Sequence, residues 1–533
     1  MARSNSASSK LRQIRARNKP MSEPVETNGW HTVTAISYKD VNRAIASAKG
    51  PSSFSQQDAG GSASITGTCG PWQLTTGGSG PLLMMALPIL DGKIAIGPNT
   101  YLITPCTATV KITATYISSH DAKMDLVNDP SQAATVMSCV PAQKDFLADA
   151  VLQKLLNEWL TSNLGMFSAV FATVDFDAQY ATDGLKWLKP SDKGYAVAEP
   201  MHGATLSNSV FGVLCLIDGD TQSDGLVWQI SPQAIPPGAD AAFIVSQETF
   251  LQHMLLAAVP SMFKGIGQDP PEKHFAIDNL GTRILNTGTV TLLPVKLSNG
   301  RVVTPSVQAK NFAIQLDESE LEIAITDMEF EFSPGITVKL TYNGRCTISL
   351  DNDHHILQLK VTTQSGSGSV QVSKGLQIAQ IVLGVASVVL SLVGGVGGAV
   401  GRSASAAVTT ATEATLGTAE AVGEDAATSA QAAISCCRGL ISGTPAEISE
   451  IAARCFTVAR VGMIGAFATT LMPAITQILV AVESGDYKSM PKITDLTGEA
   501  VGKTVIWPTE VGEFKLASAG LNGAFQFGLA HVS

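Results

Sequence analysis

The segment from residue 312 to residue 350 constrains the fold most, because apolar and polar residues alternate along it. The alternation begins at Phe312, breaks at Ser333-Pro334-Gly335, resumes at Ile336 and meets an Asn-Gly pair at Asn343-Gly344. A period of two places every second side chain on the same face of a strand, and Pro-Gly and Asn-Gly favour tight turns. The segment therefore predicts an antiparallel meander with one buried face.

Two helices are expected to interrupt the strands of the first half. Between residues 143 and 164, apolar residues recur at steps of three and four, which is typical of an amphipathic helix lying on a sheet. A shorter helix is expected over Gln247–Leu256, with Ser246 as its N-cap. The remainder of 27–373 is interpreted mostly as strands.

The chain changes character between residues 374 and 484, where an apolar block rich in Ala and Gly favours helices. Within it, residues 375–401 and 461–482 carry no charge, and each run is long enough to span a bilayer, which takes about 20 apolar residues. Both runs contain small and polar residues, so buried helices packed on a sheet or on each other explain them equally simply. Burial, the lining of an apolar groove, and insertion into a membrane all stay open for this block.

Composition excludes several classes of function. Only 15% of the 533 residues are charged, whereas soluble domains average about 25%, and 45% are hydrophobic. A mostly disordered protein and a polytopic membrane protein are both inconsistent with this pattern. The net charge of −10 argues against nucleic acid as a partner. Eight cysteines without a C-x-x-C pair indicate reduced, buried thiols.

The predicted fold class is α+β, rich in antiparallel sheet, and the chain divides into four parts. Residues 1–26 form a basic leader that we expect to be disordered, since it has no apolar core of the kind found in a secretory signal peptide. Sheet-rich lobes follow at 27–270 and at 271–373 together with 485–533, and the apolar helical block is 374–484.

Motifs for catalysis, metals and cofactors fail on spacing. The glycines of Gly498–Thr504 are one residue short of a phosphate-binding loop. Asp218, Gly219, Asp220 and Asp224 lack the glycine and the closing glutamate of a calcium loop, so an acidic hairpin loop is the simpler interpretation. His354 and His355 would point to opposite faces of a strand. No catalytic residue, metal or cofactor is therefore predicted.

Several short runs resemble, in order, the sequence blocks of the clostridial P-forty-seven/OrfX family. The runs are Asn28-Gly29-Trp30, Asp40-Val41-Asn42, Trp72 to Gly78, Asn208 to Phe211, Ser231 to Pro236, Trp507-Pro508 and Leu521-Asn522-Gly523. This resemblance implies a fold like that of the tubular lipid-binding (TULIP-like) proteins, such as bactericidal/permeability-increasing protein. In that fold a helix wraps onto a curved antiparallel sheet and leaves an apolar groove. The resemblance also implies a non-enzymatic role in a toxin gene cluster.

An apolar groove would be lined by large residues from the strands and helices. The candidates are Trp159, Phe330, Phe332, Leu340, Ile381, Leu392 and Met463. For each of them an ordinary core position is the simpler interpretation, since large apolar side chains are usually buried.

The sequence therefore predicts an insecticidal accessory protein of a toxin complex that binds an apolar, lipid-like ligand or a partner protein. The alternative is a membrane-active toxin that inserts the 375–401/461–482 helical hairpin. Expected partners are a hydrophobic ligand, other toxin-cluster proteins, a second copy or a membrane. The expected location is the cytoplasm, or outside the cell after release with a toxin complex.

Overall fold

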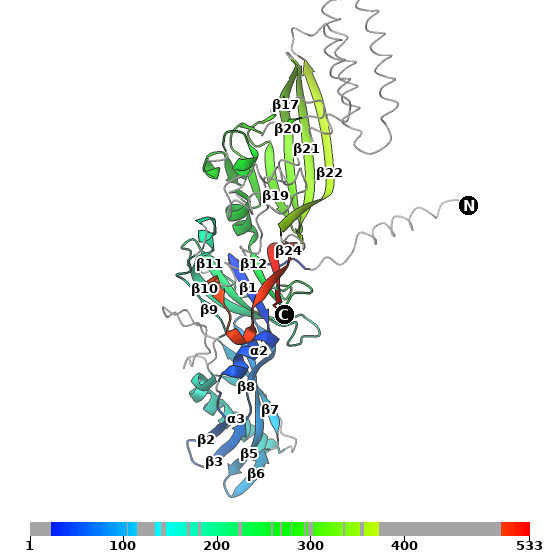
Figure 1. The fold of residues 1–533 in the computed structure, drawn as a ribbon. Helices are drawn as coiled ribbons and strands as arrows, with labels where there is room; N and C mark the ends of the chain where they lie inside the picture. The colour runs from blue at the N-terminus through cyan, green and yellow to red at the C-terminus, as the bar shows by residue number, and fades with distance from the viewer. Residues whose placement is uncertain are drawn as a thin grey trace, which may run out of the picture.

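In the described part of the chain, three large antiparallel sheets follow one another along an elongated molecule (Figure 1). The computed structural model describes residues 23–48, 50–103, 105–113, 134–139, 145–167, 171–179, 183–221, 226–256, 259–266, 269–278, 280–292, 295–296, 302–333, 336–351, 356–372 and 503–532. The β-rich class predicted from the sequence is confirmed. The apolar block 374–484 and nearly all of the leader 1–26 lie outside the described residues.

A seven-stranded sheet forms one end of the molecule, with the order β2-β3-β5-β7-β8, and β4 and β6 also pair with β5. Its strands are β2 (Ser53–Gln57), β3 (Ala63–Cys69), β4 (Gln73–Ser79), β5 (Leu82–Ile96), β6 (Asn99–Ile103), β7 (Cys106–Thr113) and β8 (Thr135–Cys139). Helix α3 (Phe146–Asn163) packs on β2, β3, β5 and β8. Asp145 caps it by accepting from the backbone N–H groups of Leu147 and Ala148. The amphipathic helix expected within 143–164 is confirmed.

The six-stranded sheet in the middle is buried on both faces. Its order is β10 (Pro190–Ala198), β11 (Val210–Ile217), β1 (Thr32–Ser37), β12 (Ala241–Val245), β25 (Ala524–His531) and β24 (Phe514–Asn522). Every residue of β1, β11 and β12 is buried. Ile36 and Phe211 belong to one core cluster, whereas Val33 and Leu214 belong to a second one. This alternation follows directly from the period of two in a strand.

Helix α2 (Tyr38–Ser47) begins directly after β1, in a region that the sequence was interpreted to fill with strands. Ser37 is its N-cap and accepts from the backbone N–H of Asp40. Val41, Ala44 and Ile45 form its buried side. The sequence did not predict α2 because the helix is short and follows β1 without a linker. Its apolar residues, spaced at the helical period of 3.6, are hard to distinguish from the alternation of the strand before them.

The third sheet has eight strands and contains the predicted meander. Its strands are β13 (Phe275–Ile277), β14 (Arg283–Asn286), β15 (Val290–Thr291), β18 (Ser306–Val307), β19 (Phe312–Asp317), β20 (Glu320–Ser333), β21 (Ile336–Asp351) and β22 (Ile356–Val372). The alternation from Phe312 onward is confirmed as β19, β20 and β21. The turn expected at Asn343-Gly344 is wrong, because both residues continue β21 and pair with β20 and β22 on either side.

The smaller elements connect the three sheets. They are η1 (Leu164–Phe167), β9 (Thr173–Val174), η2 (Asp183–Leu188), α4 (Gln247–Thr249), η3 (Phe250–Leu256), η4 (Val259–Met262), η5 (Pro271–Lys273), β16 (Val295–Lys296), β17 (Val302–Val303), β23 (Val505–Ile506) and η8 (Thr509–Val511). The helix expected over 247–256 is confirmed, and Ser246 caps it through the backbone N–H of Thr249. After one α-helical turn it continues as a wider π-helix.

The C-terminal strands complete the middle sheet. The sequence grouped residues 485–533 with 271–373, whereas β25 pairs with β12, and β24 pairs with β25 (Figure 1). Strand β24 also lies against β21 of the third sheet. Pairing partners so distant along the chain are chosen by register and packing, which local alternation does not encode. The four-part division of the chain otherwise stays a prediction.

A buried carboxylate fastens this C-terminal strand to helix α2. Asp40 is 2% exposed, and its Oδ1 atom lies 2.8 Å from the Arg43 guanidinium and 3.2 Å from His531 Nε2. Its other oxygen accepts from the Ser37 hydroxyl at 2.8 Å. Arg43 also donates to the backbone carbonyl of Val511 at 3.2 Å. The Asp40–Arg43 pair therefore joins α2 to two distant segments of the chain, at Val511 and at His531.

We predict that Asp40→Ala lowers the free energy of unfolding by about 2 kcal/mol, because it removes the acceptor of the buried Ser37 hydroxyl and the charged partner of the half-buried Arg43 and His531. Urea denaturation of the full chain measures the change. Asp317→Ala serves as the matched control, since Asp317 contacts Arg345 in an exposed ion-pair network and should leave the midpoint nearly unchanged. Equal effects of the two substitutions would contradict the assignment.

Candidate apolar-ligand site

Helix α3 covers the seven-stranded sheet with its apolar side, and Trp159 lies at this interface. The indole is 5% exposed, and its ring centroid is 5.9 Å from those of both Phe54 on β2 and Phe167 on η1. Phe167 in turn packs edge-on against Trp72 at 6.0 Å. A helix lying on a sheet is the arrangement predicted around Trp159, and its contacts there are aromatic side chains of the same chain.

The other predicted lining residues do not come together with Trp159. Phe330 is buried on β20, in the sheet at the opposite end of the molecule (Figure 1). Phe332 and Leu340 belong to β20 and β21, and their side chains lie outside the described part. Ile381, Leu392 and Met463 lie outside the described residues altogether. The groove predicted from these seven residues therefore stays a prediction.

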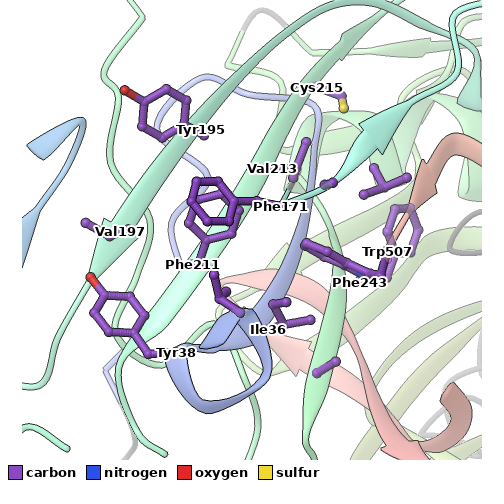
Figure 2. Packing of buried hydrophobic residues seen from close by; sticks show 14 of the residues in the cluster. Ile36, Tyr38, Phe171, Tyr195, Val197, Phe211, Val213, Cys215, Phe243 and Trp507 are labelled. Atoms are coloured by element: carbon purple, nitrogen blue, oxygen red, sulfur yellow. The ribbon is translucent and has the colours of Figure 1, made fainter. Parts of the chain in front are cut away.

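The inner face of the six-stranded sheet carries an apolar layer that the sequence did not single out. Figure 2 shows Ile36, Phe211 and Phe243 projecting from β1, β11 and β12 into this layer, with Phe171 and Trp507 beside them. The Phe171 and Phe211 rings lie 5.4 Å apart. The layer belongs to one continuous cluster that also includes Trp159 and Phe330. The described parts of the sheets thus share one apolar interior.

Two tyrosine hydroxyls lie at the edge of this layer, on the side away from Trp507 (Figure 2). Tyr195 donates to the carbonyl of Pro81 at 3.3 Å. The buried hydroxyl of Tyr38 has no hydrogen-bond acceptor among the described residues. Burial raises the pKa of both phenols, so both are neutral donors at physiological pH. The one feature of the sequence that could have pointed to Tyr38 is its position directly after Ser37, the N-cap of α2.

A carboxylate at the junction of the first two sheets lies close to Tyr38. Glu199 accepts from the backbone N–H groups of Gly77 and Gly78 at 2.7–2.9 Å, and its charge adds to the rise in the pKa of Tyr38. A Cβ atom on Gly78 would lie 2.9 Å from the Tyr38 hydroxyl, so only glycine fits at this approach. Gly80 and Val197 bridge the two sheets by mutual backbone hydrogen bonds of 2.8–2.9 Å.

A lysine is buried within the same sheet. The Lys193 side chain is 2% exposed, and its ammonium nitrogen lies 4.0 Å above the ring centroid of Phe176. Burial lowers the pKa of Lys193 to about 8. Burial also raises the pKa of the neighbouring Cys215 thiol to about 12, so Cys215 stays protonated.

Titratable groups also gather where β11 ends. His253 lies 2.8 Å from Asp218 and stacks on Trp187 at 5.2 Å, and burial lowers its pKa. His31 lies 3.6 Å from Asp220. Asp218 has a positive φ of 60° in the loop that follows β11. The acidic hairpin predicted here is wrong, because the next strand, β12, pairs with β1 and β25 and not with β11. Asp224 lies outside the described residues, and within the described ones no three His, Cys, Asp or Glu side chains form a group suited to a metal.

Comparison with known proteins identifies the family. The family model described as OrfX-like, Protein OrfX2/OrfX3/P47, matches residues 27–425. The chain belongs to the OrfX-like family. Protein OrfX3 of Paraclostridium bifermentans is 25% identical over 380 residues, which cover 64% of this chain and 69% of that protein. Protein OrfX3 of Clostridium botulinum (strain Kyoto / Type A2) is 26% identical over 433 residues, which cover 70% and 84%.

Solved structures agree at the level of the fold. P47 from Clostridium botulinum A2 superposes with a TM-score of 0.59 at 13% identity, covering 96% of this chain and 99% of P47. P47 of Clostridium botulinum E1 gives 0.56 at 13% identity, covering 95% and 100%. The resemblance stated from the sequence blocks is thus confirmed, and the OrfX-like fold accounts for the β-rich architecture.

The OrfX-like sequence blocks occupy joints between elements. Asn42 on α2 makes two hydrogen bonds with the backbone of Leu74, at 2.7 and 3.0 Å, as a paired strand would. Trp30 is fully buried and donates from its indole to the carbonyl of Val227 at 3.0 Å. Gln526 donates to the carbonyls of Gln233 and Ala234. These blocks therefore identify the contacts that hold the fold together.

None of the helices in the described residues is both long enough and apolar enough to cross a membrane. The two uncharged runs at 375–401 and 461–482 lie outside those residues.

We predict that Lys193→Met changes how stability depends on pH. The pKa of Lys193 in the folded chain, about 8, lies below the usual lysine value of 10.5, so between these two values the unfolded chain binds the proton more tightly. The unfolding free energy of the wild type should therefore rise between pH 8 and pH 10, by about 2 kcal/mol relative to Lys193→Met. Urea denaturation at the two pH values measures this difference. Lys515→Met, which removes an exposed lysine from β24, should show the same change with pH as the wild type. If Lys193→Met also showed that change, the lowered pKa of Lys193 would be refuted.

Proposed function

We propose that this OrfX-like protein is a non-enzymatic accessory component of a toxin complex, with an insecticidal role, that holds an apolar, lipid-like ligand between its sheets and the helices that cover them. The observation that carries the proposal is the continuous apolar cluster running from α3, through the layer of Figure 2, to the eight-stranded sheet, in a chain of this family. The family descriptions name no catalytic activity, and the proposal assigns no catalytic residue, metal or cofactor.

The chemistry of the interior fits an apolar molecule with a small polar end. Ligand pockets of this kind are mostly apolar, with a few polar groups that fix the orientation of the ligand. The Tyr38 hydroxyl is a neutral donor at the edge of the apolar layer with no acceptor among the described residues. A carbonyl or ester oxygen of a lipid-like molecule would supply that acceptor. The same apolar surface supports the alternative occupant, a segment of a partner toxin-cluster protein or of a second copy.

Location and partners follow as part of the proposal. The protein would be made in the cytoplasm and leave the cell with the complex. The net charge of −10 disfavours nucleic acid and anionic lipid surfaces as partners.

We expect organic extraction of the purified full-length chain, followed by mass spectrometry, to recover a lipid in a fixed molar ratio. Tyr38→Phe should reduce the recovered lipid about three- to tenfold, because it removes one hydrogen bond to the ligand, and should leave the Tm within about 2 °C. Tyr195→Phe is the matched control: it breaks the bond to Pro81, so it should lower the Tm and keep the lipid. A wild-type chain that carries no lipid would remove the ligand-carrier function.

The membrane-active alternative rests on the two uncharged runs in the sequence and is tested separately. Liposomes loaded with a fluorescent dye, of neutral and of anionic composition, are mixed with the full chain at pH 7 and pH 5. The proposed carrier function predicts no dye release beyond that of a control protein. Release at either pH would favour insertion of the 375–401/461–482 hairpin.

A further inference from the structure

Two cysteines face each other across neighbouring strands of the seven-stranded sheet. The sulfur atoms of Cys106 on β7 and Cys139 on β8 are 3.7 Å apart. Cys139 is paired with Ala108, and Cys106 precedes Ala108 by two residues. Residues two apart in a strand share a face, so the two thiols form a diagonal pair on the side of the sheet that α3 covers.

The local geometry leaves room for a bond between the two sulfur atoms. A disulfide has an S–S distance of about 2.05 Å, so the sulfur atoms would have to approach by roughly 1.7 Å. Cys139 is the last residue of β8, which ends the strand order of the described sheet. The β7–β8 ladder also shifts register between Thr109 and Val110. A short strand at the sheet edge can make this adjustment at lower cost than a central strand.

The two thiols differ in exposure and in acidity. Cys106 is half-buried, whereas Cys139 is buried. The hydrogen bond between them lowers the pKa of Cys106, and the same bond together with burial raises the pKa of Cys139. The thiolate is the nucleophile in disulfide exchange, so Cys106 is the attacking residue and Cys139 the resolving one.

We propose that Cys106 and Cys139 are a redox-active thiol pair. Thiol–disulfide exchange with a small-molecule disulfide, such as oxidised glutathione, converts the pair into an intramolecular disulfide. Cys106 loses its proton to water, and the thiolate attacks one glutathione sulfur; the glutathione S–S bond breaks, and one glutathione leaves as a thiolate that takes a proton from water. Cys139 then loses its proton to water and attacks the Cys106 sulfur; the mixed disulfide bond breaks, and the second glutathione leaves as a thiolate that also takes a proton from water. Two protein thiols are oxidised, and one disulfide is reduced to two thiols.

The cross-link would fasten the edge of the sheet. The disulfide would join β8 to β7, and α3 begins only seven residues after Cys139. It would also close a loop of about 30 residues, which restricts the conformations of the unfolded chain. The pair would be open in a reducing cytoplasm and closed outside the cell. This inference is independent of the proposed ligand, since it concerns strand pairing alone.

Digestion with trypsin gives a direct test, because Cys106 is the only cysteine in the tryptic peptide 94–111 and Cys139 is the only cysteine in the tryptic peptide 124–144. The full chain is equilibrated with oxidised glutathione or with a reducing agent, quenched with a maleimide, digested and analysed without reduction. We expect the oxidised sample to contain the two peptides joined, with two fewer labelled thiols, and its Tm to be higher by roughly 5 °C. Cys139→Ser should instead accumulate glutathione on Cys106.

Cys69→Ser is the matched control. It removes a buried thiol of the same sheet that donates to the Pro51 carbonyl, and it should leave the joined peptides unchanged. The proposal is overturned if both peptides carry maleimide after oxidation, if Cys106 of the wild type stops at the glutathione adduct, or if Cys106 bonds to another cysteine.

Discussion

The pairing of β12 with β25 is the interaction on which the rest of the structure depends. It places residues 524–531 beside 241–245, so the chain returns from the third sheet to complete the middle one. The central strands β1, β11 and β12 are buried throughout, so their backbone groups must pair with neighbouring strands, and β25 supplies the second neighbour of β12. The carboxylate of Asp40 reinforces the closure, because it holds His531 of β25 and Arg43 of α2 in one hydrogen-bonded group.

Closure of the middle sheet explains why the apolar interior is continuous. The sheets at either end pack against a common core, from Trp159 on α3 to Phe330 on β20. Buried polar groups lie mainly at the joints, where Glu199, Asn42 and Gln526 satisfy backbone groups of other elements. The blocks that carry the family resemblance are these joints. The ligand-holding role that we propose would use this scaffold.

Local patterns predicted those elements whose periodicity is long and uninterrupted. The alternation from Phe312 and the apolar stripe of α3 are both confirmed, as is the cap at Ser246. Helix α2 escaped prediction because it is short and continues directly from a strand. The turn predicted at Asn343-Gly344 was wrong because hydrogen bonds to the two neighbouring strands, β20 and β22, override the turn preference of this pair. Of the predicted groove residues, Trp159 lies on the buried side of α3, against the seven-stranded sheet, while Phe330 belongs to a different sheet.

The sequence by itself determined the β-rich class and the resemblance to the OrfX-like family. These properties follow from composition, from periods of two and 3.6, and from the order of short blocks along the chain. Only the tertiary structure decided that the last strands belong to the middle sheet, that Tyr38 lies beside Glu199, and that Cys106 faces Cys139. Each of these contacts joins residues far apart in the chain. Their proximity depends on register and packing across whole sheets, which no local pattern specifies.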